Sequence, residues 1–301
     1  MPLVDIDNLN DPRIDDYRNV READLVGRRG LFIAEGPLVV RRLIEESPFP
    51  CRSMLLARKR VGAMEREVAA LGARAPDAPV LVASQRVMDA IVGFPIHRGV
   101  LAVGERAETT TLADALGAPL QTQRTIVALE GLANHDNVGG VFRNAAAFGV
   151  DQVAFDARTC DPLYRKAIRV SIGCALTLPF ARVERWPGAP AGSSDMRAAG
   201  GLAQLDEAGF VTIALTPARD AIALSAAMED VPPVARVALL LGEEGAGLTA
   251  ETLAQANIRA RIDTTNAVDS LNVANAGAIA MHMLRQRRNQ YASATSDHDK
   301  P

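Results

Sequence analysis

The sequence is poor in aromatic residues and cysteine and contains no long apolar run. Aromatic side chains make up 4% of the 301 residues, so platforms for stacking nucleic-acid bases are scarce. No stretch approaches the roughly 18 uninterrupted apolar residues of a membrane helix. Three cysteines without paired spacing exclude a disulfide framework and a zinc site, and the four histidines are too scattered to indicate any other metal. We therefore expect reduced thiols at Cys51, Cys160 and Cys174.

The sequence also lacks an excess of positive charge. Lys and Arg number 33 against 36 Asp and Glu, which gives a net charge of −3. Any surface that binds a polyanion must therefore be local. Short basic runs occur near Arg58–Arg60, Arg158–Arg169 and Arg285–Arg288, although such runs are also typical of solvated helix faces. The first residues lack the basic and apolar regions of a secretion signal, so we expect a cytoplasmic protein.

With 48% hydrophobic and 23% charged residues, the chain is typical of a folded protein of one or two domains. The first part predicts a small α/β domain over residues 1–105, with the amphipathic spacing of a helix over Leu38–Glu46. Short apolar runs occur at Leu31–Ala34, Met54–Ala57, Val80–Ala83 and Val100–Val103. Scattered Thr, Ala, Gly and Pro then predict a linker over residues 106–124.

A second domain is predicted over residues 125–291, where strand and helix signals alternate. The expected strands lie near Ile126–Leu129, Gln152–Phe155, Val211–Leu215, Val237–Leu241 and Ile258–Ile262. Because these runs are continuously apolar, they favour a parallel sheet buried on both faces. A surface loop is expected over Trp186–Gly201, leading into a helix over Met196–Ala208. The polar residues 292–301 predict a disordered tail.

Three stretches rich in Gly and Asn each follow an expected strand. In the first stretch, Glu130–Asn144, we expect Asp136 or Asn137 to cap a helix. Arg143 stands in a row of small and apolar residues, so its charge needs an anionic partner or a route to water. The glycine loop Gly242–Leu248 fits neither a dinucleotide fingerprint nor a Walker loop. In the third stretch, Ile262–Ala278, Asp269 or Ser270 is expected to cap a helix of small residues.

Together these stretches resemble the three signature motifs of the SpoU (TrmH-like) family, S-adenosylmethionine-dependent methyltransferases that act on the ribose 2′-hydroxyl of RNA. The first motif is matched by Asn137, Gly139, Arg143 and Phe148–Gly149, the second by Gly242–Leu248, and the third by Ser270–Val273. Asp161–Gly173 is similar to the segment between the motifs, and Phe32–Gly36 and His97–Val100 are similar to a front domain that binds the substrate. Two departures are slight: Glu243 stands where Ser or Asn is common, and Ala274 where many members have a second Ser.

The resemblance implies an α/β fold of the SPOUT class, in which a parallel-sheet domain with a C-terminal trefoil knot follows the small substrate-binding domain. It implies a homodimer with the active site at the subunit interface. S-adenosylmethionine is then the cofactor, bound in the knot against the backbone of Gly242, Ile262 and Leu271, with Leu241 and Asn272 near.

The implied reaction is displacement at a methyl carbon by a ribose oxygen, which calls for a base or a strong hydrogen-bond acceptor. Arg143 is expected first to grip the target phosphate, because a guanidinium is a poor base, with deprotonation as its second role. Glu244 is the alternative base, or it ties the cofactor loop together. Asn137 and Asn272 bind the ribose hydroxyl or each other, and Ser270 binds the hydroxyl or caps its helix.

RNA is the expected partner, with ribosomal RNA favoured over transfer RNA by analogy with the front domain. The resemblance favours RNA contacts at Arg165, Lys166 and Arg169 beside the site, and at Arg41, Arg58 and Lys59 in the front domain. No metal and no membrane partner are expected. Two other classes remain open: a non-catalytic RNA-binding protein of the same fold, and a nicotinamide oxidoreductase, against which the lack of an early G-x-G-x-x-G motif argues.

Overall fold

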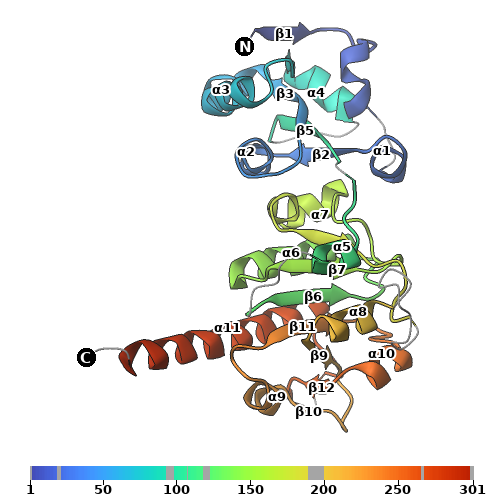
Figure 1. Ribbon diagram of the computed structural model, residues 1–301. Helices are drawn as coiled ribbons and strands as arrows, with labels where there is room; N and C mark the ends of the chain where they lie inside the picture. Colours follow the sequence, from blue (N-terminus) through green and yellow to red (C-terminus); the bar gives the residue numbers. More distant parts are fainter. Residues whose placement is uncertain are drawn as a thin grey trace. The chain divides into compact units, whose positions relative to one another are not determined.

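The computed structural model describes residues 2–18, 22–92, 98–106, 108–117, 123–188, 200–265 and 268–298. The chain folds into two compact units (Figure 1). The first unit consists of Met1–Glu108 together with Asp161–Thr177, and the second of Thr109–Cys160 together with Leu178–Pro301. A piece of the predicted second domain, residues 161–177, therefore belongs to the first unit.

The first unit is built on a five-stranded sheet with the strand order β1-β4-β3-β5-β2. β5 pairs antiparallel with β2 and β3, and the other neighbours are parallel. The strands are β1 (Leu3–Ile6), β2 (Leu31–Glu35), β3 (Cys51–Ala57), β4 (Val80–Ala83) and β5 (Val100–Glu105). The helices are α1 (Glu22–Arg28), α2 (Pro37–Glu45), α3 (Glu65–Arg74), α4 (Gln85–Val92) and α7 (Arg165–Val170), with 3-10 turns at Pro12–Tyr17, Arg58–Arg60, Gly62–Met64 and Cys174–Leu176.

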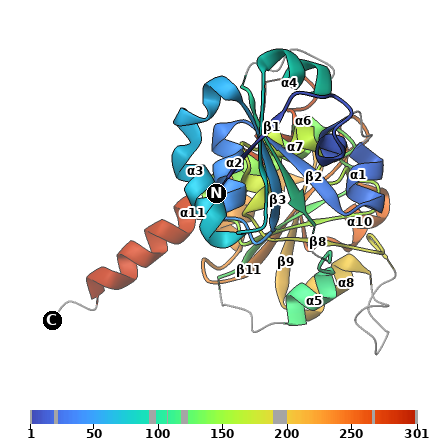
Figure 2. The same cartoon turned by 90° about the horizontal axis from the view of Figure 1, so that it is seen from above.

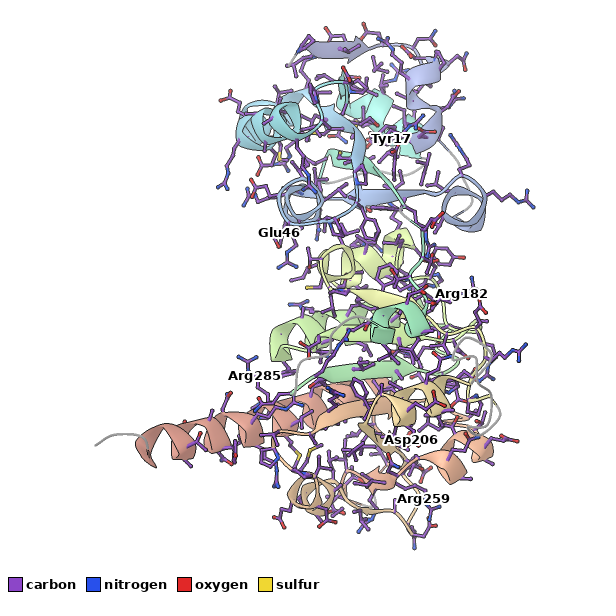
Figure 3. The ribbon with its side chains drawn as sticks, in the orientation of Figure 1. Tyr17, Glu46, Arg182, Asp206, Arg259 and Arg285 are labelled. Carbon is purple, nitrogen blue, oxygen red and sulfur yellow. The ribbon has the colours of Figure 1, made fainter. Side chains whose placement is uncertain are left out.

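The apolar runs expected in this part of the chain are strands, because each is buried along its length. α2 begins with Pro37, whose fixed φ suits the first turn of a helix. Its buried residues Val39, Val40, Leu43 and Ile44 follow helical spacing and cover the sheet. Tyr17 lies in the interior of this unit, where its hydroxyl lies 2.7 Å from Ser53 Oγ (Figure 3).

The second unit contains a seven-stranded, wholly parallel sheet with the order β10-β12-β9-β11-β6-β7-β8. The strands are β6 (Thr125–Leu129), β7 (Gln152–Phe155), β8 (Phe180–Arg182), β9 (Phe210–Leu215), β10 (Ile222–Ala223), β11 (Arg236–Leu241) and β12 (Ile258–Arg261). The helices are α5 (Leu112–Gly117), α6 (His135–Phe148), α8 (Gly201–Glu207), α9 (Leu224–Asp230), α10 (Ala250–Gln255) and α11 (Val273–His298). All five predicted strands and their parallel arrangement are confirmed.

Helices cover both faces of this sheet, as its continuously apolar strands require. α5 and α8 lie side by side (Figure 2) and bury Leu112, Leu116 and Leu205 against the sheet. On the other face α6 places Phe142 edge-on to Phe180 of β8, with ring centroids 6.0 Å apart. α11 packs along α6 and β11, so the C-terminal helix returns to the centre of the sheet.

The structure differs from the sequence-based expectations at two boundaries. The predicted linker contains α5, because Leu112 and Leu116 give it an apolar face that packs on α8. The predicted tail is helical up to His298, since no Gly or Pro interrupts the chain there. The loop expected over Trp186–Gly201 and the start of the helix over Met196–Ala208 fall mostly outside the described residues, which resume at Gly200 ahead of α8.

Candidate functional site

Three segments meet at the carboxyl edge of the parallel sheet in the second unit. The first follows β6, the second follows β11 and the third follows β12, and they are the three stretches singled out in the sequence. In parallel sheets, loops at the carboxyl ends of neighbouring strands commonly form ligand sites. The fold therefore brings together segments more than a hundred residues apart in the chain.

The first segment enters α6 through Asn134. Its side chain accepts a hydrogen bond of 2.9 Å from the Asp136 amide, so Asn134 is the N-cap. The expectation that Asp136 or Asn137 caps this helix is wrong, because both already lie in its first turn. Asn137 is thereby buried, and Asn144, two turns later, donates to the carbonyl of Ala274 at 2.9 Å. That bond ties α6 to the start of α11.

The second segment is a glycine loop that folds tightly on itself. The backbones of Glu243 and Gly247 exchange two hydrogen bonds of 3.1 and 2.8 Å. A Cβ atom on Gly242 would lie 2.2 Å from the carbonyl carbon of Gly247 and from the nitrogen of Leu248. A side chain at position 242 is therefore incompatible with this loop.

A chain of hydrogen bonds joins all three segments through one amide. Asn137 donates from Nδ2 to Oε2 of Glu244 at 2.9 Å, and its Oδ1 accepts from Nδ2 of Asn272 at 2.8 Å. Asn272 Oδ1 in turn accepts from the amides of Ala274, at 3.0 Å, and Asn275, at 3.4 Å. Asn272 is thus the residue that caps α11, and the expectation of Asp269 or Ser270 in that role is wrong. Of the two alternatives for Asn137 and Asn272, the structure shows the bond between them.

The second and third segments, together with the loop after β9, line a cavity of about 800 Å³, and Asn137 of the first segment is not among its lining residues. All five residues expected at the cofactor line it: Leu241, Gly242, Ile262, Leu271 and Asn272. Two further residues expected in catalysis, Glu244 and Ser270, line it as well. Arg219, on the loop after β9, also lines the cavity, and no motif in the sequence pointed to it.

Arg143 stands apart from this cavity. It is exposed on α6 and is not among the residues that line the cavity. Within the part of the chain that the structure describes, its guanidinium makes no hydrogen bond or ion pair. The structure therefore leaves its charge available to an anion outside this chain.

Two buried carboxylates beneath the motif loops were not found by sequence reasoning. Glu130 and Asp156 directly follow β6 and β7, and both pair with Arg158, at 3.3 and 3.2 Å. Glu130 is 1% exposed, and its Oε2 has no hydrogen-bond partner among the described residues. Its Oε1 also accepts from the amide of Thr249, at 3.4 Å. The signal available in the sequence was an acidic residue placed immediately after each apolar strand.

The residues expected to contact RNA all lie in the first unit. Arg165 and Arg169 form ion pairs with Glu35, and Arg41 pairs with Glu67 at 2.6 Å. Arg58 pairs with Asp5 at 2.6 Å on the surface. Lys59 and Lys166 are exposed. All six belong to the first unit, whereas residues 161–177, which carry Arg165, Lys166 and Arg169, were expected in the second domain.

The described residues contain no group of three or more His, Cys, Asp and Glu placed to hold a metal ion. None of the helices described here is long and apolar enough to cross a membrane.

Comparison with known proteins gives consistent matches. Residues 124–282 match the SpoU rRNA Methylase family. An uncharacterised tRNA/rRNA methyltransferase of Mycobacterium bovis is 39% identical over 286 residues, covering 94% of this chain and 91% of that protein. The 23S rRNA (guanosine-2′-O-)-methyltransferase RlmB of a Burkholderia species is 27% identical over 216 residues, covering 71% and 81%.

Among solved structures, an AdoMet-bound rRNA methyltransferase from Sinorhizobium meliloti has a TM-score of 0.73 at 23% identity, covering 94% of this chain and 98% of that one. The likeness confirms the expected fold class, a mixed α/β fold with a parallel sheet and a C-terminal helix where the knot is expected.

Proposed function

Because the chain belongs to the SpoU rRNA methylase family of RNA methyltransferases, we propose that it transfers a methyl group from S-adenosylmethionine to a ribose 2′-hydroxyl of ribosomal RNA. The observation that carries this proposal is the hydrogen-bonded chain from Glu244 through Asn137 to Asn272 at the edge of the cavity. The likeness to RlmB, named as a 2′-O-methyltransferase of 23S rRNA, supports the ribose 2′-oxygen as the methyl acceptor and ribosomal RNA as the substrate. We also propose a cytoplasmic location, because ribosomal RNA is the proposed substrate.

The cavity fits S-adenosylmethionine in size and chemistry. Its volume of about 800 Å³ lies in the range of sites for small molecules and cofactors. Leu241, Ile262 and Leu271 offer apolar walls for a purine ring, and the carboxylates of Glu243 and Glu244 suit a donor that carries positive charge. When bound, the donor supplies a methyl group on a sulfonium centre, ready for displacement.

Each residue of the hydrogen-bonded chain then has a defined task. Asn137 fixes one carboxylate oxygen of Glu244, so that this side chain keeps one orientation at the cavity. Glu244 accepts the proton of the attacking ribose hydroxyl, and Ser270 offers a hydrogen bond to the sugar. Asn272 holds Asn137 in place and caps α11. Arg143 binds the phosphate next to the target ribose, because a guanidinium grips a phosphate through two parallel N–H groups. Alignment of the oxygen with the methyl carbon provides much of the rate enhancement.

We also infer a homodimer formed through α6 and α11. A cavity of about 700 Å³ lies between them, lined by residues that include Phe148, His282 and Arg285, the last of which is labelled in Figure 3. Ile279 is 37% exposed on α11. A second copy that covers this face brings its own α6, with Arg143, to the interface, so the site draws on both chains. Light scattering after gel filtration tests this proposal, and a monomer at micromolar concentration would contradict it.

The reaction is tested by incubating the protein with tritiated S-adenosylmethionine and either deproteinised 23S rRNA or total tRNA from cells that lack the gene. Nuclease digestion and mass spectrometry then identify the labelled nucleoside. We expect 2′-O-methylated nucleosides from the rRNA, in a linkage that resists alkaline hydrolysis. Label in a base-methylated nucleoside would contradict the ribose 2′-oxygen as the methyl acceptor. Label only in tRNA would contradict ribosomal RNA as the substrate. The absence of transfer to either would favour a non-catalytic RNA-binding protein.

A further inference from the structure

The loop between β9 and β10 is tied to β12, the strand that lies between them in the sheet. The amide of Thr216 donates to a backbone carbonyl of β12 at 3.0 Å, and Arg261 Nε donates to the carbonyl of Ala221 at 3.0 Å. Between these two contacts, Asp220 forms an ion pair of 2.9 Å with Arg259 of β12. The backbone of the loop is therefore fixed at the carboxyl edge of the sheet.

Arg219 stands in the middle of this loop and lines the cavity. It is exposed and, within the described ranges, its guanidinium makes no hydrogen bond or ion pair. The other arginine that lines the cavity, Arg261, is engaged with the carbonyl of Ala221 and, at 2.6 Å, with the carboxylate of Asp263. Arg219 thus presents a cation to the cavity from a fixed backbone, and the described part of the chain does not neutralise it.

The other charged side chains that line the cavity, apart from Arg261, are acidic. They belong to Glu243, Glu244 and Asp269. S-adenosylmethionine carries positive charge on its sulfonium and α-ammonium groups and negative charge on its α-carboxylate. Acidic side chains attract the two positive groups and repel the carboxylate. A donor bound among them therefore needs a cation for its carboxylate, and Arg219 supplies one.

We propose that Arg219 binds the α-carboxylate of the methyl donor and thereby selects donors that carry this group. This inference rests on the proposed function, because it places S-adenosylmethionine in the cavity. A guanidinium matches a carboxylate through two parallel N–H donors, and a fixed loop lowers the entropy lost on binding. S-adenosylhomocysteine, the product, keeps the same carboxylate, so the contact is equally strong before and after methyl transfer. Such a contact lowers the KM for the donor and leaves kcat unchanged.

The substitution Arg219→Gln separates this proposal from simple electrostatics by the sign of its effect. The donor carries a net positive charge, so removing a cation from the cavity strengthens donor binding if only total charge matters. If Arg219 binds the carboxylate, donor binding weakens instead. Decarboxylated S-adenosylmethionine lacks only this carboxylate and tests the same contact from the side of the ligand. Its binding should not weaken when Arg219 is replaced.

Titration calorimetry in the absence of RNA gives the Kd of both donors for each protein. The wild type should bind S-adenosylmethionine more tightly than the decarboxylated donor. Arg219→Gln should weaken binding of S-adenosylmethionine about tenfold, a modest loss for a contact between charged groups because the side chain is exposed. The preference between the two donors should then disappear. Arg219→Lys keeps the charge without the paired N–H groups and should restore part of the preference.

Arg182→Gln is the matched control. Arg182, labelled in Figure 3, is another exposed arginine of the second unit, and it does not line the cavity. This variant should bind both donors as the wild type does. Neither Arg182 nor Arg219 makes a side-chain hydrogen bond or ion pair in the described part of the chain, so thermal unfolding should be unchanged in both Gln variants.

Equal affinity of the wild type for the two donors, or an undiminished preference in Arg219→Gln, would overturn the proposal. Unchanged donor binding together with weaker binding of 23S rRNA in Arg219→Gln would assign this side chain to an RNA phosphate instead. Both results leave the proposed methyl transfer standing. Loss of the preference in Arg219→Gln, in a protein whose wild type methylates neither RNA, supports this inference and refutes only the proposed reaction.

Discussion

The amide nitrogen of Asn137 donates a 2.9 Å hydrogen bond to the carboxylate of Glu244, a residue 107 positions later in the chain. Asn137 is 5% exposed, so its two polar atoms depend on protein partners, and Asn272 supplies the second. A single side chain therefore aligns the helix after β6, the glycine loop after β11 and the cap of α11.

The substitution Asn137→Ala should lower methyl transfer on the order of a hundredfold, because Glu244 loses the donor that orients it. Single-turnover methyl transfer with tritiated donor measures the effect. Asn134→Ala is the control, since Asn134 caps the same helix but contacts neither Glu244 nor Asn272 among the described residues. Loss of that cap should cost about 1 kcal/mol of unfolding free energy with little change in kcat. Equal activity losses in the two variants would assign Asn137 to helix stability alone.

Arg143→Ala should abolish methyl transfer while folding and donor binding stay intact. The side chain is exposed and does not line the cavity, so its removal leaves neither a buried void nor a broken contact in the chain. Isothermal titration of S-adenosylmethionine, beside a tritium-transfer assay, separates the two effects. Arg259→Ala, at another exposed arginine of the second unit, is the control and should retain activity. Full activity in Arg143→Ala would remove this residue from the mechanism.

The sequence predicted the sheet of the second unit well, because continuously apolar strands have few alternatives to a sheet buried on both faces. The helix caps were misassigned, since Asn134, Asp136 and Asn137 are all good capping residues and only the backbone conformation selects one of them. Residues 161–177 pack in the first unit, where Arg165 pairs with Glu35, and no local pattern in the sequence connects these two residues. Long-range ion pairs of this kind carry no periodic signal in a single sequence.

Gly242→Ala should abolish binding of S-adenosylmethionine. The added Cβ would lie 2.2 Å from backbone atoms of Gly247 and Leu248, and backbone cannot move aside as a flexible side chain can. The loop must therefore open, which deforms the wall of the cavity. Gly117→Ala, at the end of α5, meets nothing within 4 Å and should leave binding unchanged, with slightly raised stability. Titration calorimetry and thermal unfolding measure both variants, and wild-type affinity in Gly242→Ala would contradict the prediction.

The first unit should lose stability in alkaline solution because of Cys51. Burial raises the pKa of its thiol from about 9 to about 12, so the folded chain keeps a proton that the unfolded chain releases above pH 9. Unfolding is therefore favoured progressively as the pH rises from about 9 toward 12, by up to about 1.4 kcal/mol per pH unit for one such group. Burial also raises the pKa of Tyr17, which acts in the same direction at higher pH. Urea unfolding between pH 7 and 10.5 measures the free energy of unfolding at each pH. This free energy should fall less steeply with pH in Cys51→Ala than in the wild type. Identical slopes in the two proteins would show that the thiol does not cause the loss of stability.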